Sequence, residues 1–413
     1  MKNIIFNLIV IFTAFPFVVQ SQGINPPLSD LDTLYQALIQ RHPKLIGGNE
    51  KEQFNSFYKK IRSKYPSYTR NQRIFKMTEL VASLHDGHSK MGINFDTAYH
   101  FHELPVNLYV FKDGVFIRRA AGPYSKYTGM KVIKIGTLPI DTIRKRLLPL
   151  LHYENASSVN DILPSRLIIP ELLQYIGAIP STDVVPYLLE DSMKVQYTAM
   201  LKVIPSTEKF NWVSGVRNTD TMPLYLQNRD KNYWYSYIDT LHLFYFHFSA
   251  VQDMDDITFE KFVDEMFKKI NSLPISKMVI DIRRNNGGDN TLNKPLIHAL
   301  IRCDKVNQKG NLFTIIGRNT FSAAVNLAAD LENHTNTIFV GEPTGAAPNH
   351  FGETNMMRLP VSKLLVMYSS LYWQFVSPKD IRKSIDPDIP ISLTWYDYKN
   401  NLDPCLAAII KVK

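Results

Sequence analysis

The chain has 413 residues, of which 45% are apolar, and carries a formal net charge of +9 at pH 7. This length exceeds one typical domain, so two or three folded units are expected, with enough apolar residues to fill their cores. The lysines and arginines are scattered along the chain rather than clustered, which disfavours nucleic-acid binding and indicates a solvated basic surface.

The first 21 residues have the pattern of a secretory signal peptide. Lys2 supplies the positive charge, Ile4–Val19 is an apolar run, and cleavage is expected before Gln22. The run is short for a bilayer span, although a retained membrane anchor is the alternative. We therefore expect an exported protein, periplasmic or extracellular, with no stable membrane insertion after signal removal.

The two cysteines, Cys303 and Cys405, are too few for a disulfide scaffold. Export permits a bridge between them, but nothing in the sequence brings them side by side. We expect two free or buried thiols.

Residues 22–100 are expected to form a helical unit. Ser29 is a suitable N-cap for its first helix, which should end at His42 because Pro43 disfavours helical geometry in the residue before it. Apolar residues at helical spacing mark this helix and two more: Leu31, Leu34, Leu38 and Ile39; Phe54, Phe57 and Ile61; Ile74, Met77, Val81 and Leu84. The third helix leads into a loop with the sequence HDGHS.

Strands are expected in residues 101–150. Alternating apolar residues in Leu104–Val110 lead through a turn at Lys112–Gly114 into a second strand. The segment Gly129–Asp141 resembles the signature of PDZ domains, which implies a PDZ-like β unit. Residues 151–236 show no pattern that assigns them a role beyond a connecting region.

Residues 237–413 alternate between strands and helices. Strands are expected at 240–248, 278–282, 312–316 and 337–341, and helices at 259–270, 292–302 and 323–331. Alternation with short loops predicts an α/β layer of mostly parallel strands, and active groups in such sheets lie at the carboxyl ends of the strands.

Ser322 lies where a strand-like run, Leu312–Ile316, gives way to a helix-like run, Ala323–Leu331. A serine at such a turn can present its hydroxyl to a cleft. The amide after it lies at a helix N-terminus, where unpaired N–H groups favour a developing negative charge. Helix capping is the alternative role for a serine at this position.

Two other segments carry candidate catalytic groups. Gly287 and Gly288 allow backbone conformations closed to other residues, so their turn either aims N–H groups at an anion or is an ordinary strand-to-helix turn. His88 titrates near neutral pH and can accept a hydroxyl proton, and Asp86 can brace the loop or orient a histidine. His85 and His88 lack further ligands at zinc spacing, so no metal is expected.

Taken together, the segments LHDGHS, VIDIRRNNGGDN and GRNTFSAAVNLAADLENHTNTIFVGEPTG resemble the C-terminal processing (tail-specific) serine peptidases, including their tricorn-core-like branch. The resemblance covers Lys277–Asp403 and His85–Ser89. It implies a ClpP/crotonase-like catalytic core in residues 237–413, beside the helical unit and the PDZ-like unit that the family often carries.

The resemblance also implies roles for single residues. Ser322 would be the nucleophile, and the oxyanion would be held by the amide of Ala323 together with that of Gly287 or Gly288. A serine of this kind needs a base and two or so oxyanion donors, but no metal or other cofactor.

The base is where this sequence departs from part of the family, because no lysine follows the GEPTG segment. The tricorn-like branch uses a histidine from the segment that matches HDGHS, which favours His88 as the base. His350 is a second candidate, with a solvent-facing or substrate-contact residue as its alternative role. Asp86, Glu342 and Asp380 are candidates for a supporting acid.

We therefore expect a secreted serine peptidase of the tail-specific type that acts on peptides or unfolded protein ends. Two alternatives stay open. One is a catalytically inactive peptide- or lipid-binding module on the same fold, and the other is a serine hydrolase of a small substrate.

Overall fold

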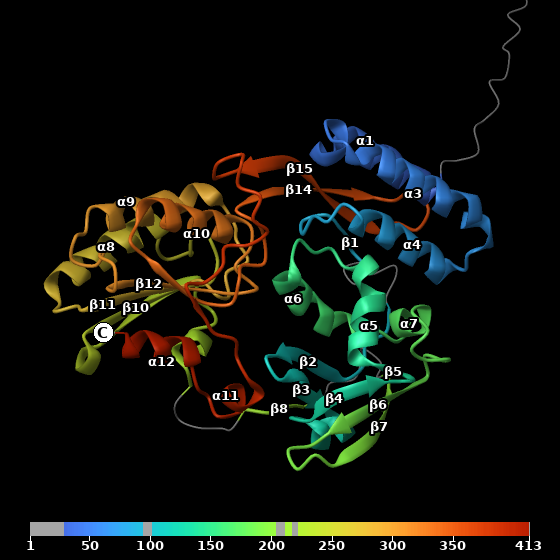
Figure 1. Ribbon diagram of the computed structural model, residues 1–413, viewed down its shortest axis with the longest axis horizontal. Helices are drawn as coiled ribbons and strands as arrows, with labels where there is room; N and C mark the ends of the chain where they lie inside the picture. The colour runs from blue at the N-terminus through green and yellow to red at the C-terminus, as the bar shows by residue number, and fades with distance from the viewer. Residues whose placement is uncertain (1–28, 94–100, 204–210, 217–221, 413) are drawn as a thin grey trace, which may run out of the picture.

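A computed structural model describes residues 29–93, 101–203, 211–216 and 222–412. The expected signal peptide lies outside the described residues. Within them the strands form three sheets, and helices pack on these sheets to give a mixed α/β fold, as predicted (Figure 1). No helix in these ranges is both long enough and apolar enough to cross a membrane.

The N-terminal helices form as expected from their caps and apolar spacing. The Ser29 hydroxyl accepts a hydrogen bond from the N–H of Asp32 at the start of the first helix, which ends before His42. The four helices are α1 (Asp30–Arg41), α2 (Pro43–Ile46), α3 (Glu50–Lys64) and α4 (Arg70–Ala82). Their leucines, with those of the neighbouring sheet, are buried in one core.

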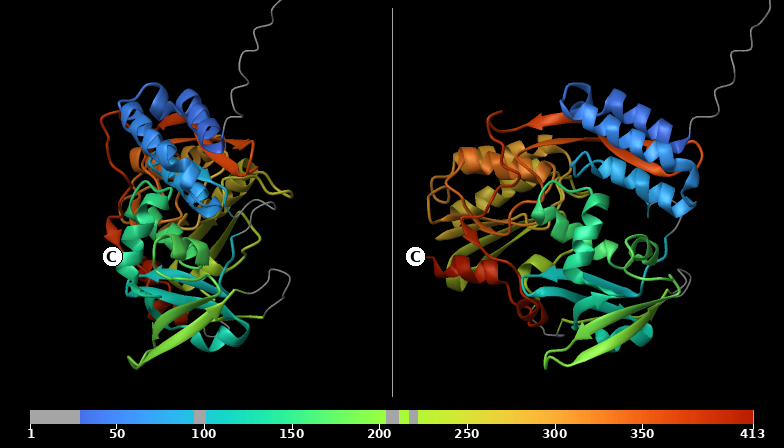
Figure 2. Two further views of the ribbon diagram at one scale, coloured as in Figure 1. Left: turned by 90° about the vertical axis from the view of Figure 1, so that its right-hand side faces the viewer. Right: turned by 45° about the vertical axis from the view of Figure 1, so that its right-hand side comes forward.

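A long hairpin joins this helical unit to the rest of the chain. Its strands are β14 (Asn349–Arg358) and β15 (Leu365–Gln374), and β15 pairs with the short strand β1 (Lys90–Met91) that follows the HDGHS loop. Figures 1 and 2 show the hairpin lying along α1, α3 and α4. Residues far apart in the sequence therefore meet at this loop.

The second sheet contains seven strands and begins with the predicted hairpin at Lys112–Gly114. Its strands are β2 (Val106–Phe111), β3 (Gly114–Ala121), β4 (Lys131–Ile135), β5 (Leu138–Pro139), β6 (Val184–Glu190), β7 (Gln196–Lys202) and β8 (Trp212–Ser214). Helices α5 (Ile140–Leu147), α6 (Ala156–Arg166) and α7 (Pro170–Tyr175) accompany it. Because β4 pairs with β6, the region after residue 150 contributes to the same sheet as the region before it.

The third sheet has the order β16-β13-β12-β11-β10-β9 and is parallel except for β9. Its strands are β9 (Tyr233–Ile238), β10 (Leu243–Phe248), β11 (Lys277–Asp281), β12 (Leu312–Ile316), β13 (Ile338–Gly341) and β16 (Ile389–Pro390). One face packs against α8 (Phe259–Ser272), α9 (Lys294–Ile301) and α10 (Ala323–His334). The other face packs against α12 (Pro404–Lys411), which follows α11 (Trp395–Lys399). Mostly parallel pairing was predicted from the alternation of elements.

Cys303 and Cys405 are both buried and free, in agreement with the sequence prediction. They lie in different cores, since Cys303 packs with the α8–α10 layer and Cys405 with α12. This separation explains why no bridge joins them.

Candidate functional site

Ser322 has an unusual backbone conformation for a serine, with φ 55° and ψ −130°. It stands between the fully buried strand β12 and helix α10, and its side chain makes no capping hydrogen bond with the helix. Positive φ in a residue with a Cβ costs about 1–3 kcal/mol and persists only where the surroundings enforce it. Thr320 contributes to that enforcement, because its hydroxyl accepts from the N–H of Gly317 and donates to the carbonyl of Ile282.

The predicted glycine turn packs directly against Ser322. A Cβ on Gly287 would lie 2.7 Å from the Cβ of Ser322 and 2.8 Å from the amide nitrogen of Ala323, so only glycine fits. The N–H of Gly287 already donates to the side-chain oxygen of Asn285, at 2.9 Å. The N–H groups of Gly288 and Ala323 donate to no other described residue. Two amides are thus free near the serine.

His88 lies beside the same turn. Its ring stacks on Phe321, the residue before Ser322, with 4.4 Å between the ring centroids. Gly87 makes this approach possible, because a Cβ there would lie 2.7 Å from the Phe321 ring. Neither ring nitrogen of His88 makes a hydrogen bond of ordinary geometry with a described residue, although its Nδ1 lies 3.9 Å from the Oδ1 of Asp86. Burial lowers the pKa of His88, although the charge of Asp86 opposes this shift.

Asp86 is the centre of a buried hydrogen-bond network that holds the HDGHS loop. It accepts from the backbone N–H of His88, from the hydroxyls of Ser89 and Ser369, and from the ring of His42 at 3.0 Å. Burial acts to raise the pKa of Asp86, but these side-chain hydrogen bonds outweigh it and lower the pKa to about 2. Asp86 therefore braces the loop as a carboxylate, and its direct ring partner is His42 rather than His88.

His350, on β14, also lies next to the His88 ring. The two imidazole rings are nearly parallel, with 5.6 Å between their centroids. His350 is only 3% exposed, so the solvent-facing alternative is wrong, whereas the substrate-contact alternative stays open because the residue lines a cavity. Its Nδ1 donates to the carbonyl of Ala347 at 2.9 Å. Burial and the neighbouring His88 lower the pKa of His350 to about 4, which keeps its ring neutral.

Glu154 also belongs to this site, although no sequence pattern pointed to it. Its carboxyl group accepts from the N–H of Gly87 at 3.2 Å and from that of Ala347 at 3.0 Å, so it ties the His88 loop to the His350 segment. Burial raises the pKa of Glu154 to about 8. No motif surrounds this residue, and its sequence neighbourhood shows no family resemblance, so only the fold identifies it.

The remaining candidate acids lie elsewhere. Glu342 forms a bidentate pair with Arg318, and Asp380 pairs with Arg382. Neither contacts a histidine of the described chain. Of the candidate supporting residues, the structure brings Asp86 and His350 next to His88 and leaves Glu342 and Asp380 with their arginines.

A metal could in principle bind Asp86, His88 and Glu154, whose ligand atoms all lie within 4.8 Å of one another. The carboxylates are poorly suited to this role. Asp86 already accepts four hydrogen bonds, and both oxygens of Glu154 accept from backbone N–H groups. Buried oxygens that are satisfied in this way have few lone pairs left for an ion.

A cavity of about 700 Å³ opens next to His350, and neither Ser322 nor His88 is part of its lining. Its lining includes Glu154, His350, Phe351 and the cationic side chains of Lys44 and Lys383. The volume is in the range of ligand-binding clefts in proteins. A ligand bound there would contact His350.

Comparisons with known proteins identify the fold. No family model and no curated protein matches this sequence. The structure of mature CPAF matches with a TM-score of 0.62 at 11% identity, and the match covers 93% of this chain and 95% of that chain. The structure of mature CPAF in complex with lactacystin matches with a TM-score of 0.61 at 11% identity, and this match covers 93% of this chain and 96% of that chain. The photosystem II D1 C-terminal processing protease matches with a TM-score of 0.41 at 14% identity, over 92% and 95%. The chain therefore has the fold of mature CPAF.

Proposed function

We propose that this protein is an exported serine peptidase that cleaves peptides or unfolded protein ends, with Ser322 as the nucleophile. The observation that carries this proposal is the strained backbone of Ser322 beside two free amides. Strain of this kind gathers at active sites, and a turn between a strand and a helix is where other hydrolases expose a nucleophilic serine.

In the proposed reaction the Ser322 hydroxyl attacks the scissile carbonyl and His88 accepts its proton. The N–H groups of Ala323 and Gly288 stabilise the oxyanion, and the first of them also benefits from the N-terminal end of α10. His88 is suited to this role because its burial favours the neutral ring, and a neutral imidazole is required of a base. His88 then returns the proton to the leaving amine.

The peptidase-type architecture extends the proposal to the rest of the chain. The parallel sheet with α8–α10 corresponds to a ClpP/crotonase-like core, and β2–β5 with α5 to a PDZ-like unit that presents peptide to the core. The apolar N-terminal run suggests that the chain acts outside the cytoplasm.

A fluorophosphonate probe tests the proposal, because it reacts with an activated serine. Wild-type protein should be labelled, Ser322→Ala should not, and the two should have the same circular dichroism spectrum. CPAF has been solved with lactacystin, so lactacystin serves as a second probe. A digest of a peptide library then separates a peptidase from an esterase.

A non-catalytic binding module is the second candidate. It is favoured by one observation, that neither nitrogen of His88 hydrogen-bonds to a described residue, Ser322 included. Wild-type protein that stays unlabelled by both probes would establish this alternative.

A further inference from the structure

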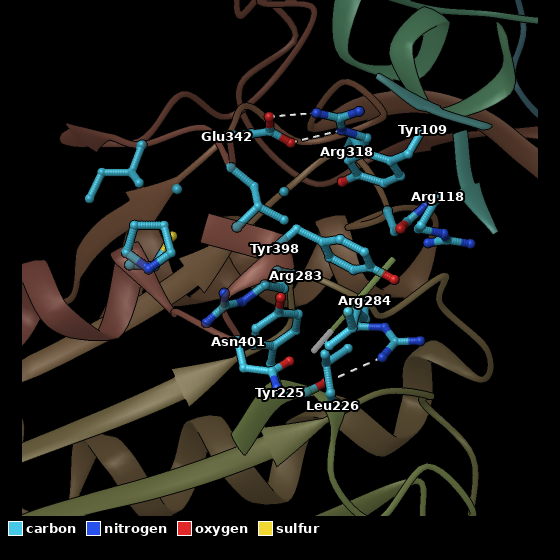
Figure 3. A pocket seen from close by; sticks show the side chains of 18 of the residues that line it. Tyr109, Arg118, Tyr225, Leu226, Arg283, Arg284, Arg318, Glu342, Tyr398 and Asn401 are labelled. Carbon is cyan, nitrogen blue, oxygen red and sulfur yellow. Dashed lines mark hydrogen bonds and ion pairs between the residues drawn. The ribbon is translucent and has the colours of Figure 1, made fainter. Parts of the chain in front are cut away.

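A second cavity, of about 610 Å³, lies at the carboxyl ends of β11, β12 and β13, where these strands face β3 (Figure 3). Its lining contains neither Ser322 nor His88 and shares no residue with the cavity beside His350. The proposed peptidase reaction makes no use of it.

Arginine dominates this second cavity. Its lining holds one carboxylate, Glu342, and six arginines: Arg118, Arg119, Arg229, Arg283, Arg284 and Arg318. Two of the six are neutralised, since Arg318 pairs with Glu342, and Arg283 pairs with Asp281 and Asp403 behind the lining. Arginines are costly to gather in a hollow unless an anion balances them.

The other four arginines have no carboxylate partner among the described residues. Arg118 donates to the side-chain oxygen of Asn107, and Arg284 donates to the backbone carbonyl of Tyr225. Burial lowers the pKa of Arg284, and the charges of Arg229 and Arg118 lower it further. These three cations therefore repel one another across the cavity.

The positive charge in excess can be counted. Glu342, Asp281 and Asp403 hold Arg318 and Arg283, and Arg119 and Arg229 are exposed to solvent. Arg118 and Arg284 are half-buried and have no carboxylate partner among the described residues, which leaves two positive charges uncompensated. A ligand that carries two negative charges would match them.

We propose that this cavity binds a small molecule with a phosphate monoester group. Arg118 and Arg284 grip the phosphate, since guanidinium groups match phosphate oxygens in a bidentate manner. Figure 3 shows both side chains and that of Tyr398 converging from β3, from the loop after β11 and from α11. The apolar side chains of Leu226 and Leu393 line the same cavity and would cover the organic part of the ligand.

The charge state distinguishes this ligand from a peptide terminus. A phosphate monoester carries nearly two negative charges at neutral pH, whereas a carboxylate carries one. Three probes separate the possibilities: phenyl phosphate, phenyl sulfate, which has a similar shape but one charge, and benzoate. Each is titrated into the full-length mature protein by isothermal calorimetry in 0.15 M NaCl at pH 7.5.

We expect phenyl phosphate to bind at least about tenfold more tightly than the other two, because its second negative charge strengthens the hydrogen bonds from the guanidinium groups. Arg284→Gln and Arg118→Gln should each weaken phenyl phosphate binding at least about tenfold. Arg302→Gln removes the same charge from an exposed site at the end of α9 and should change binding less than about twofold. Melting temperatures of the three variants verify that they are folded.

Equal binding of benzoate would identify a carboxylate site and overturn the proposal. So would the absence of phenyl phosphate binding, or an equal loss in Arg302→Gln, which would indicate a general basic surface. Ser322→Ala should bind phenyl phosphate as the wild type does, so the outcome is independent of whether Ser322 is a nucleophile.

Discussion

The strain at Ser322 predicts that glycine is more stabilising than alanine at this position. Ser322→Ala keeps a Cβ at φ 55° and ψ −130°, so the strain of about 1–3 kcal/mol persists. Ser322→Gly releases it but makes the unfolded chain more flexible, at a cost of about 0.5–1 kcal/mol. The glycine variant should therefore be more stable than the alanine variant by about 1 kcal/mol. Both variants should lose probe labelling.

The assay is urea unfolding of the two variants, followed by tryptophan fluorescence under the same conditions. Ser165 provides a control, because it lies inside α6, where the backbone is helical and φ is negative. There the order should reverse, with Ser165→Gly less stable than Ser165→Ala by about 0.8–1 kcal/mol. An alanine variant of Ser322 as stable as its glycine variant would refute the strained nucleophile turn and weaken the argument for an active site.

Further predictions concern the groups around Ser322 and the two thiols. His88→Ala should reduce turnover by about 10²–10⁴-fold and His350→Ala much less, and the reverse ranking would identify His350 as the base. Because burial lowers the pKa of His88, wild-type activity should persist as the pH falls through the ordinary histidine range and disappear only below it. Burial raises the pKa of Glu154 from 4.5 to about 8. The stability that the protonated Glu154 carboxyl group contributes to the folded state is therefore complete below pH 4.5 and declines as the pH rises towards 8. Urea unfolding from pH 4 to 9 should show a smaller decline for Glu154→Gln than for the wild type, and parallel curves would contradict the raised pKa. Cys303 and Cys405 should resist a thiol reagent in the native protein and react in urea, because both are buried and burial raises the pKa of the Cys405 thiol to about 12; rapid reaction of the native protein would contradict this.

Local patterns in the sequence were sufficient for much of the fold. The Ser29 cap and the proline after His42 define the first helix, and the alternation of short apolar runs with helical segments predicts the parallel sheet. These features depend on residues within a few positions of one another. For the same reason the sequence located Ser322 at a strand-to-helix turn and placed Gly287 and Gly288 in a second turn.

The contacts that complete the candidate site depend on distant parts of the chain. His42 and Asp86 are 44 residues apart, and Glu154 bonds to residues 67 and 193 positions away. In the sequence Asp86 lies close to both His85 and His88 and could orient either one. In the structure α2 packs against the HDGHS loop, so the ring of His42 hydrogen-bonds to Asp86 instead. His350 lies on a hairpin that pairs with β1, far earlier in the chain, and it is buried there, so of its two alternative roles the solvent-facing one is wrong and substrate contact stays open.

The arginine cavity belongs wholly to the tertiary structure. Arg118, Arg284 and Arg318 looked like scattered surface charges in the sequence, and they converge because β3 folds against the carboxyl edge of the parallel sheet. Sequence by itself determines which residues prefer a helix, a strand or a turn, since those preferences are local. The packing of distant segments decides which charged groups become neighbours and which are removed from solvent. The reason is that electrostatic and desolvation energies depend on distance through space rather than along the chain.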